Sequence, residues 1–339
     1  MDFPQFINSV QKLTVSGIPF ICLIDVEQQQ PQLWPIQDID PDQLLFATPL
    51  GSNTDHLDQN SQVTTHVSAP VVTITQPVNR STYHRGFHII QRGLHRGDSF
   101  LANLTYPVEI SVTHSLPYLF LSSRAPYRLW WKDHFTVFSP EAFISISPEG
   151  TAATFPMKGT ITANTPDAQF LLMNDPKESA EHLTVVDLLR NDLGRIGTAV
   201  RVIRYRYIDR IISQAGDILQ ASSEIRADLG NNWRQHMGNM LNDILPAGSI
   251  SGAPKLRTLQ LIAEAEQEPR GYYTGIMGHF DGSRFVSGVM IRFIEQRPGG
   301  LPSTEPMSSL RFRAGGGITI YSNEEDEYNE LHTKVRFPN

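Results

Sequence analysis

Cysteine is almost absent from this sequence, which has one, Cys22, in 339 residues. One thiol can form neither an internal disulfide nor a cysteine-based zinc cluster, so we expect a reducing, cytoplasmic compartment and a buried, inert Cys22. No apolar run approaches the roughly 20 residues that cross a bilayer. The first residues also lack a basic region followed by an apolar segment. We therefore expect neither a membrane span nor a signal peptide.

Positive charge is also in deficit, because 28 Lys and Arg residues stand against 35 Asp and Glu, for a formal net charge of −7. This balance argues against a general nucleic-acid-binding protein. Apolar residues make up 40% of the chain and charged residues 19%, which is typical of globular proteins. Large enzymes reach this length around one core, so we predict a single catalytic domain over residues 1–339.

Strand patterns and helix patterns come in separate blocks along the chain. Helices are expected over 83–96, 174–197, 232–244 and 254–267, and from 323 onward. Strands are expected over 18–25, 100–113, 118–122, 126–131, 134–138, 143–147, 152–158, 199–208, 217–227, 272–280, 284–294, 308–314 and 318–321. Residues 51–81 are rich in Ser, Thr, Asn, Gln and Pro, which is typical of an irregular exposed segment. This order predicts an α+β fold with helices packed on large, mainly antiparallel sheets.

Two pairs of glutamates have a spacing that places both members on one helix face. Glu178 and Glu181 are three residues apart, and so are Glu327 and Glu330. Two such pairs facing each other would need a divalent cation, and ligands that are all carboxylates suit Mg²⁺.

Ordinary roles also fit some of these acids. Glu178 follows Asp175 and Pro176 at the spacing of a capping box, and Glu325 could do the same after Ser322. Glu327 could be solvated surface. Glu181 and Glu330 occupy no capping position, so the metal hypothesis rests mainly on them.

Three further features are candidate anion sites. Arg292 alternates with Met290 and Ile294 on an apolar strand face, and a buried guanidinium needs a planar anion, from a ligand or from one of the chain's own acids. The run 315–317 is Gly-Gly-Gly, which allows close backbone approach and positive φ and can aim N–H groups at an anion, or simply forms a sharp bulge or turn between strands. Ser249 precedes a helix with Pro254 in its first turn, which is a second candidate anion seat.

Lys158 lies in the stretch FPMKGTITAN, which is typical of a strand end running into a turn at Gly159. An ordinary edge-strand lysine and an active-site nucleophile both fit this position.

Seven stretches, in order from about residue 83 to the C-terminus, resemble the chorismate-utilising enzymes. They are GDSFLANLTYPV, SPEAFISISPEG, PMKGT, ESAEHLTVVDLLRNDLGRIG, PAGSISGAPKLRTLQLIAEAE, YYTGIMGHF and AGGGITIYSNEEDEYNE. The first 80 residues match poorly, and we expect residues 1–80 to be a divergent, shortened N-terminal part of the same domain. The resemblance implies this family's α+β fold.

The resemblance also implies roles for individual residues. Mg²⁺ would be held by Glu181 and Glu330, with Glu178 and Glu327 in support through water. Arg292 and Tyr273 would bind the enolpyruvyl carboxylate of chorismate. The rest of the substrate cradle would consist of Gly159, Thr160, Ser249, Gly315, Gly316 and Gly317.

Within this family, a lysine before the Gly-Thr pair resembles the aminodeoxychorismate synthases, since anthranilate synthases have a small residue there. The implied role of Lys158 is to attack C2 of chorismate as the C4 hydroxyl leaves, after which ammonia adds at C4. Gln220 stands where many relatives have a histidine associated with elimination, which argues mildly against an aromatising lyase. His279 and Val286 also depart from the family's pattern, so substrate detail near them stays open.

We therefore predict an enzyme of the aminodeoxychorismate synthase component I type, which makes 4-amino-4-deoxychorismate for p-aminobenzoate and folate synthesis. Cys22 is alone and no glutaminase constellation accompanies it, so ammonia would come from a separate glutamine amidotransferase subunit. The alternatives are an anthranilate or isochorismate synthase, and a non-catalytic chorismate-binding or partner subunit. The oligomeric state stays open, with a homodimer compatible with the sequence.

Overall fold

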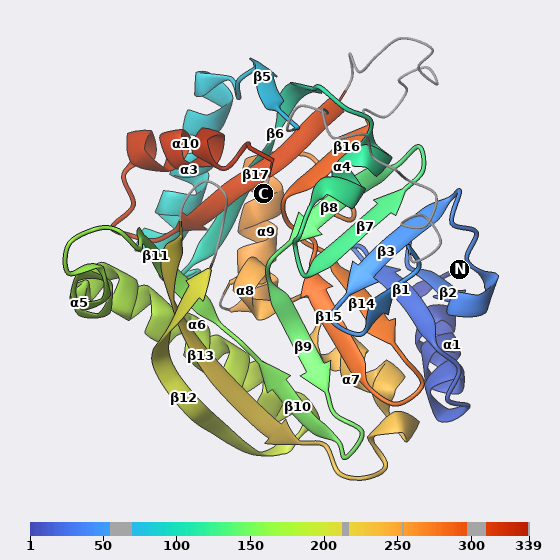
Figure 1. Ribbon diagram of the computed structural model, residues 1–339. Helices are drawn as coiled ribbons and strands as arrows, with labels where there is room; N and C mark the ends of the chain where they lie inside the picture. Colours follow the sequence, from blue (N-terminus) through green and yellow to red (C-terminus); the bar gives the residue numbers. More distant parts are fainter. Residues whose placement is uncertain (55–69, 212–216, 253, 297–309, 338–339) are drawn as a thin grey trace.

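Two large antiparallel sheets form the framework of the protein (Figure 1). The computed structural model describes residues 1–54, 70–211, 217–252, 254–296 and 310–337. The first sheet has nine strands in the order β11-β13-β10-β9-β15-β14-β1-β2, with β12 also pairing with β13. Its strands are β1 (Phe20–Ile24), β2 (Gln32–Pro35), β9 (Ala142–Ile146), β10 (Thr151–Thr154), β11 (Met157–Thr162), β12 (Thr198–Ile211), β13 (Ile218–Asp228), β14 (Ile276–Phe280) and β15 (Phe285–Val289).

The second sheet has eight strands in the order β4-β3-β7-β8-β16-β17-β6-β5. They are β3 (Leu44–Thr48), β4 (Gly51–Ser52), β5 (Val72–Gln76), β6 (Ala102–Val112), β7 (Tyr127–Trp131), β8 (Phe135–Ser139), β16 (Phe293–Gln296) and β17 (Leu310–Ile318). Strands from the beginning, middle and end of the chain therefore lie side by side in both sheets.

Helices cover the outer faces of the sheets. They are α1 (Phe3–Val15), α3 (Arg80–His95), α4 (Leu116–Ser122), α5 (Ala168–Asn174), α6 (Pro176–Ile196), α7 (Met237–Ile244), α8 (Gly248–Ser251), α9 (Lys255–Glu266) and α10 (Glu324–Thr333). In the described ranges, no helix is long and apolar enough to cross a membrane.

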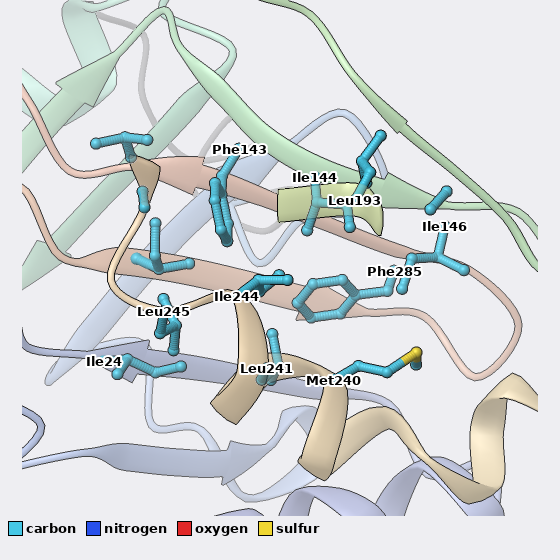
Figure 2. Close-up of a cluster of buried hydrophobic side chains, with 14 of the residues drawn as sticks. Ile24, Phe143, Ile144, Ile146, Leu193, Met240, Leu241, Ile244, Leu245 and Phe285 are labelled. Carbon is cyan, nitrogen blue, oxygen red and sulfur yellow. The ribbon is translucent and has the colours of Figure 1, made fainter. Parts of the chain in front are cut away.

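Three apolar clusters hold these layers together. Residues of α1, α6 and α7 pack on the nine-stranded sheet, where Leu193 and Leu241 belong to the same buried cluster as Phe143 and Phe285 (Figure 2). A second cluster joins α3, α9 and α10 to β6 and β17 of the eight-stranded sheet. The third lies between the sheets and includes side chains from β1, β3, β8 and β14. Burial of apolar surface on both faces of each sheet explains the long apolar runs in the sequence.

The α+β architecture predicted from the sequence is confirmed, and most elements lie close to their expected positions. Residues 118–122 were expected as a strand, but they belong to helix α4, which packs Leu119 and Phe120 inward. The helix expected over 232–244 is a 3₁₀ turn at Trp233–Gln235 followed by α7. Helices α1, α5 and α8 were not anticipated.

Two corrections concern residues of the candidate site. The strands expected on either side of the glycine run are one continuous strand, β17, whose Gly315 to Gly317 pair with β6. Arg292 does not lie within a strand, because β15 ends at Val289 and β16 begins at Phe293. The chain crosses from one sheet to the other between them, and Arg292 takes a left-handed φ of 57° in that crossover.

The polar segment expected at 51–81 contains more regular structure than its composition suggests. It begins in β4, includes β5 at Val72–Gln76, and ends in the first turn of α3, which Asn79 caps. Residues 55–69 lie outside the described part of the chain.

Candidate active site

A polar cavity of about 550 Å³ lies where β11 and α6 meet β17 and α10. Its lining includes nearly every residue that the sequence singled out: Lys158, Gly159, Thr160, Glu178, Glu181, Tyr273, Arg292, Gly315, Gly316, Gly317, Glu327 and Glu330. Ser249 belongs to α8, but its side chain is outside the described structure, while the adjacent Ile250 lines the cavity. Residues far apart in the chain thus converge on one space, in the region of Figure 1 where β11, β17 and α10 meet.

Lys158 reaches this space from β11 because of an irregularity in the strand. The strand does not end at Gly159, as the sequence suggested, but continues to Thr162. Its pairing with β13 shifts register between Met157 and Thr160, where Gly159 takes a φ of 82°. Such a bulge re-aims neighbouring side chains. The Lys158 amine lies 3.4 Å from Oε2 of Glu181.

The first glutamate pair is presented by the start of α6. Asp175 caps this helix by accepting a hydrogen bond of 2.9 Å from the backbone N–H of Glu178. The Glu178 side chain lines the cavity, and Glu181 follows one turn later. Burial, followed by the charge of Glu181, raises the pKa of Glu178 above its usual range.

The second pair lies on α10. Asn323 caps this helix by accepting from the N–H groups of Glu325 and Asp326, so a capping role for Glu325 after Ser322 is wrong. Ser322 instead donates its hydroxyl to Oε1 of Glu327 at 2.7 Å. Burial raises the pKa of Glu327 despite this bond, and the neighbouring Glu330 adds to the rise.

Glu330 differs from its neighbour because it already has a cationic partner. The amine of Lys334 lies 2.6 Å from Oε1 of Glu330 and also donates to the backbone oxygen of Gly315. Burial acts to raise the pKa of Glu330, but the charge and hydrogen bond of Lys334 outweigh it and the pKa is lowered. Lys334 was not predicted from the sequence, although it lies four residues after Glu330 on the same helix.

The three glycines of β17 permit close packing rather than a turn. None of them has a positive φ, so the positive φ expected from the sequence is wrong, whereas the expected close backbone approach is confirmed. A Cβ on Gly316 would lie 3.2 Å from Oε2 of Glu327 and 3.6 Å from Oε1 of Glu330. A Cβ on Gly317 would lie 3.7 Å from the Lys158 amine. Because β17 has no side chains at these positions, the two glutamates of α10 and the lysine of β11 can all lie close to its backbone.

Arg292 and Tyr273 also line the cavity, and Arg292 brings a guanidinium to it. The guanidinium of Arg292 donates to the backbone oxygen of Lys334 at 3.0 Å, and in the described part of the chain no carboxylate pairs with it. An internal salt bridge, one of the two alternatives from the sequence, is therefore not found among the described residues. Burial, with a contribution from the nearby Arg336, lowers the pKa of Arg292. Burial raises the pKa of Tyr273 to about 12, so its hydroxyl stays protonated at neutral pH.

Two residues that depart from the family's pattern, Gln220 and His279, differ in their position relative to the cavity. Gln220 lines the cavity and lies opposite Thr160 across the β11–β13 ladder. His279 is not part of the cavity lining; its Nδ1 lies 2.7 Å from the hydroxyl of Thr48, and its ring packs on Phe46. Burial lowers the pKa of His279 to about 4, which keeps the ring neutral.

The donor set of the cavity fits Mg²⁺, since it offers four carboxylates and the pKa values of two are raised by burial and by like charge. The amine of Lys158 contacts Glu181 of the first pair, and the amine of Lys334 contacts Glu330 of the second. Among the described residues, no three of these four acids bring oxygens within 4.8 Å of one another. A cation would therefore have to displace the lysine contacts and draw the two pairs together.

Comparison with known proteins is consistent with this geometry. The family of chorismate binding enzymes matches residues 24–339. An uncharacterized PabA-like protein of Pasteurella multocida is 46% identical over 338 residues, covering 100% of this chain and 99% of its own. Aminodeoxychorismate synthase component 1 of Salmonella typhimurium is 32% identical over 274 residues, which is 76% of this chain and 57% of that protein.

A solved structure supports the fold alone. The menaquinone-specific isochorismate synthase of Escherichia coli superimposes with a TM-score of 0.69 at 17% identity, over 98% of this chain and 80% of that one. With the family match over nearly the whole chain, these findings define the class: the protein belongs to the chorismate binding enzymes. It acts on chorismate and stands near the aminodeoxychorismate synthases.

Proposed function

We propose that this chain is the chorismate-aminating component of an aminodeoxychorismate synthase. The observation that carries the proposal is the placement of the Lys158 amine 3.4 Å from Glu181, in a cavity whose lining also includes Arg292. The same cavity holds a group of carboxylates and a guanidinium that, among the described residues, has no carboxylate partner. An amine in this cavity can reach the ring of a bound dicarboxylate. The relative from Salmonella typhimurium that bears this name supports the same choice.

Chorismate carries two carboxylates, and the cavity offers a separate place for each. Arg292, with Tyr273 beside it, would bind the enolpyruvyl carboxylate, since a guanidinium matches a planar anion with paired hydrogen bonds. Glu181 and Glu330 would hold Mg²⁺, with Glu178 and Glu327 supporting it through water. When bound, Mg²⁺ would supply positive charge to the ring carboxylate and to the departing C4 oxygen. Gly159, Thr160, Ser249 and the Gly315–Gly317 backbone would enclose the ring.

The chemistry would then run in two displacements. The neutral Lys158 amine forms a bond to C2, the ring double bonds shift, and the C4–O bond breaks, with the oxygen leaving as water once it takes a proton. Ammonia next forms a bond to C4, the double bonds shift back, and the C2–N bond to Lys158 breaks. The amine of Lys158 is regenerated, and the product is 4-amino-4-deoxychorismate, a precursor for p-aminobenzoate and folate.

The ammonia would come from a separate glutamine amidotransferase. The only cysteine, Cys22, is buried in β1, and burial raises the pKa of its thiol to about 12, so it cannot act as a glutaminase nucleophile. The names of the PabA-like relatives are in line with such a partner.

Product analysis tests the proposal. The purified protein is incubated with chorismate, Mg²⁺ and an ammonium salt, and the product is identified by chromatography and NMR. We expect an amine at C4. An amine at C2 would identify an anthranilate-type synthase, a hydroxyl at C2 an isochorismate synthase, and no product a binding-only subunit; each of these results would overturn the proposal.

A further inference from the structure

A second cluster of metal-binding side chains lies outside the chorismate cavity, where α3 meets the first turn of α10. His84 and His88 occupy neighbouring turns on the exposed side of α3, and Glu324 is the first residue of α10. One ligand atom from each of these three lies within 4.8 Å of the other two. We propose that this cluster binds a divalent transition-metal ion of the Zn²⁺ type and joins the two helices.

The distances match those that such an ion imposes. Nδ1 of His84 lies 3.1 Å and Nε2 of His88 lies 3.3 Å from the same Glu324 oxygen. A tetrahedral Zn²⁺ with bonds of about 2.0–2.1 Å holds neighbouring donor atoms roughly 3.3 Å apart. Small side-chain adjustments would therefore let all three donors face one ion, with the fourth position open to water.

The chemistry of the donors selects the ion. Two imidazoles and one carboxylate favour Zn²⁺, Ni²⁺, Cu²⁺ or Co²⁺, whereas Mg²⁺ takes oxygen ligands. Mg²⁺ would thus occupy the carboxylates of the cavity and leave this cluster unbound. The two sites can be distinguished by metal as well as by position.

The backbone positions of the cluster are already fixed by the packing of α3 on α10. The ring of Tyr83, next to His84, meets the ring of Tyr328 edge to face at a centroid distance of 5.2 Å. Tyr328 also donates its hydroxyl to the backbone oxygen of Val78, just before α3, at 2.7 Å. A metal ion would meet donors that need little reorganisation, which favours binding. The bound ion would tie the start of α10, the helix of Glu327 and Glu330, to α3.

The alternative is that the histidines only share hydrogen bonds with Glu324. Titration of the full chain with Zn²⁺ by calorimetry separates the two cases. The protein is first freed of metal with a chelator and then supplied with excess Mg²⁺, which occupies the cavity acids. H84Q and H88Q each remove one imidazole donor. H95Q is the matched control, because His95 lies exposed on the same helix, away from Glu324.

We expect the wild-type protein and H95Q to bind one more equivalent of Zn²⁺ than H84Q and H88Q. Zn²⁺ should also raise the melting temperature of the first two proteins more than that of the last two, because it binds the folded state. Equal stoichiometry in all four proteins, or no Zn²⁺ bound by the wild-type chain, would overturn the proposal.

Discussion

The amine of Lys158 lies 3.4 Å from Oε2 of Glu181, so the candidate nucleophile contacts a candidate metal ligand. The same arrangement recurs on the other side of the cavity, where Lys334 lies 2.6 Å from Glu330. In both places a lysine balances the charge of a carboxylate that the proposal assigns to Mg²⁺. Binding of the cation should therefore release the Lys158 amine toward the substrate, which couples metal binding to nucleophile availability.

Replacing Lys158 tests whether its amine reacts or only carries charge. Lys158→Ala should lower turnover by at least roughly 10³-fold, while Mg²⁺-dependent chorismate binding stays close to that of the wild type. Lys158→Arg keeps the positive charge beside Glu181 but cannot attack carbon, so it should be as inactive as the alanine variant. Steady-state kinetics and chorismate titration measure both effects. An active arginine variant would remove the covalent step from the account.

Metal binding should release protons. The pKa values of Glu178 and Glu327 are raised, by burial first and by their glutamate neighbours, so these acids keep protons above the usual value of 4.5. In the metal-free protein they contribute stability below that value, and this contribution is lost as the pH rises through the raised pKa values. Mg²⁺ favours the ionised forms, so its affinity should fall as the pH is lowered through the same window.

Calorimetry in two buffers with different ionisation enthalpies measures this release of protons. Glu178→Gln and Glu327→Gln should each reduce the number released per Mg²⁺. An affinity that does not change with pH, or a proton count that neither variant lowers, would speak against a role for these two acids near the ion.

Neighbouring glycines in β17 should respond differently to alanine. In Gly316→Ala the new Cβ meets Oε2 of Glu327 at 3.2 Å, so Mg²⁺ affinity should fall with little change in stability. In Gly315→Ala it would lie 2.2 Å from the backbone oxygen of Leu104, which the strand pairing cannot accommodate. That variant should lose about 1–3 kcal/mol of stability or more. Denaturant unfolding and metal titration of both variants check this contrast, and identical behaviour would contradict it.

The buried ion pair between Glu266 and Arg270 should be important for stability. Glu266 bonds Arg270 and also accepts from the backbone N–H and hydroxyl of Thr105. Removing one partner leaves a buried charge unpaired, so Glu266→Ala should cost about 3–5 kcal/mol. Glu264→Ala is the control, because Glu264 is exposed on the same helix. Chemical denaturation gives both values, and equal losses would show that the pair contributes little.

The sequence predicted correctly the parts of the site whose positions depend on residues close by in the chain. The Asp175–Pro176 start placed α6 correctly, because a cap and a proline fix where a helix begins. Once α6 was placed, the spacing of Glu178 and Glu181 put both on one face. Local patterns also singled out Lys158 and Arg292, and the resemblance to known enzymes added the roles implied for them. The backbone positions expected for both residues were wrong.

The errors arose where tertiary pairing overrides local preference. Gly315–Gly317 look like a turn in isolation, but β6 pairs with them and the absent side chains make room for α10. Alternation through Met290 predicted a strand at Arg292, and only the existence of a second sheet explains the break there. The pairing of Lys334 with Glu330 has an i,i+4 spacing that the sequence shows, but its contact with Gly315, 19 residues away, depends on how α10 packs on β17.

Mapping the covalent bond tests the central claim most directly. The protein is mixed with chorismate and Mg²⁺ without ammonium, quenched in acid within the first turnover, digested and examined by mass spectrometry. We expect the peptide with Lys158 to gain the mass of chorismate less one water, and added ammonium to remove this species as 4-amino-4-deoxychorismate forms. Formation of that product with no label on Lys158 at any time would contradict it.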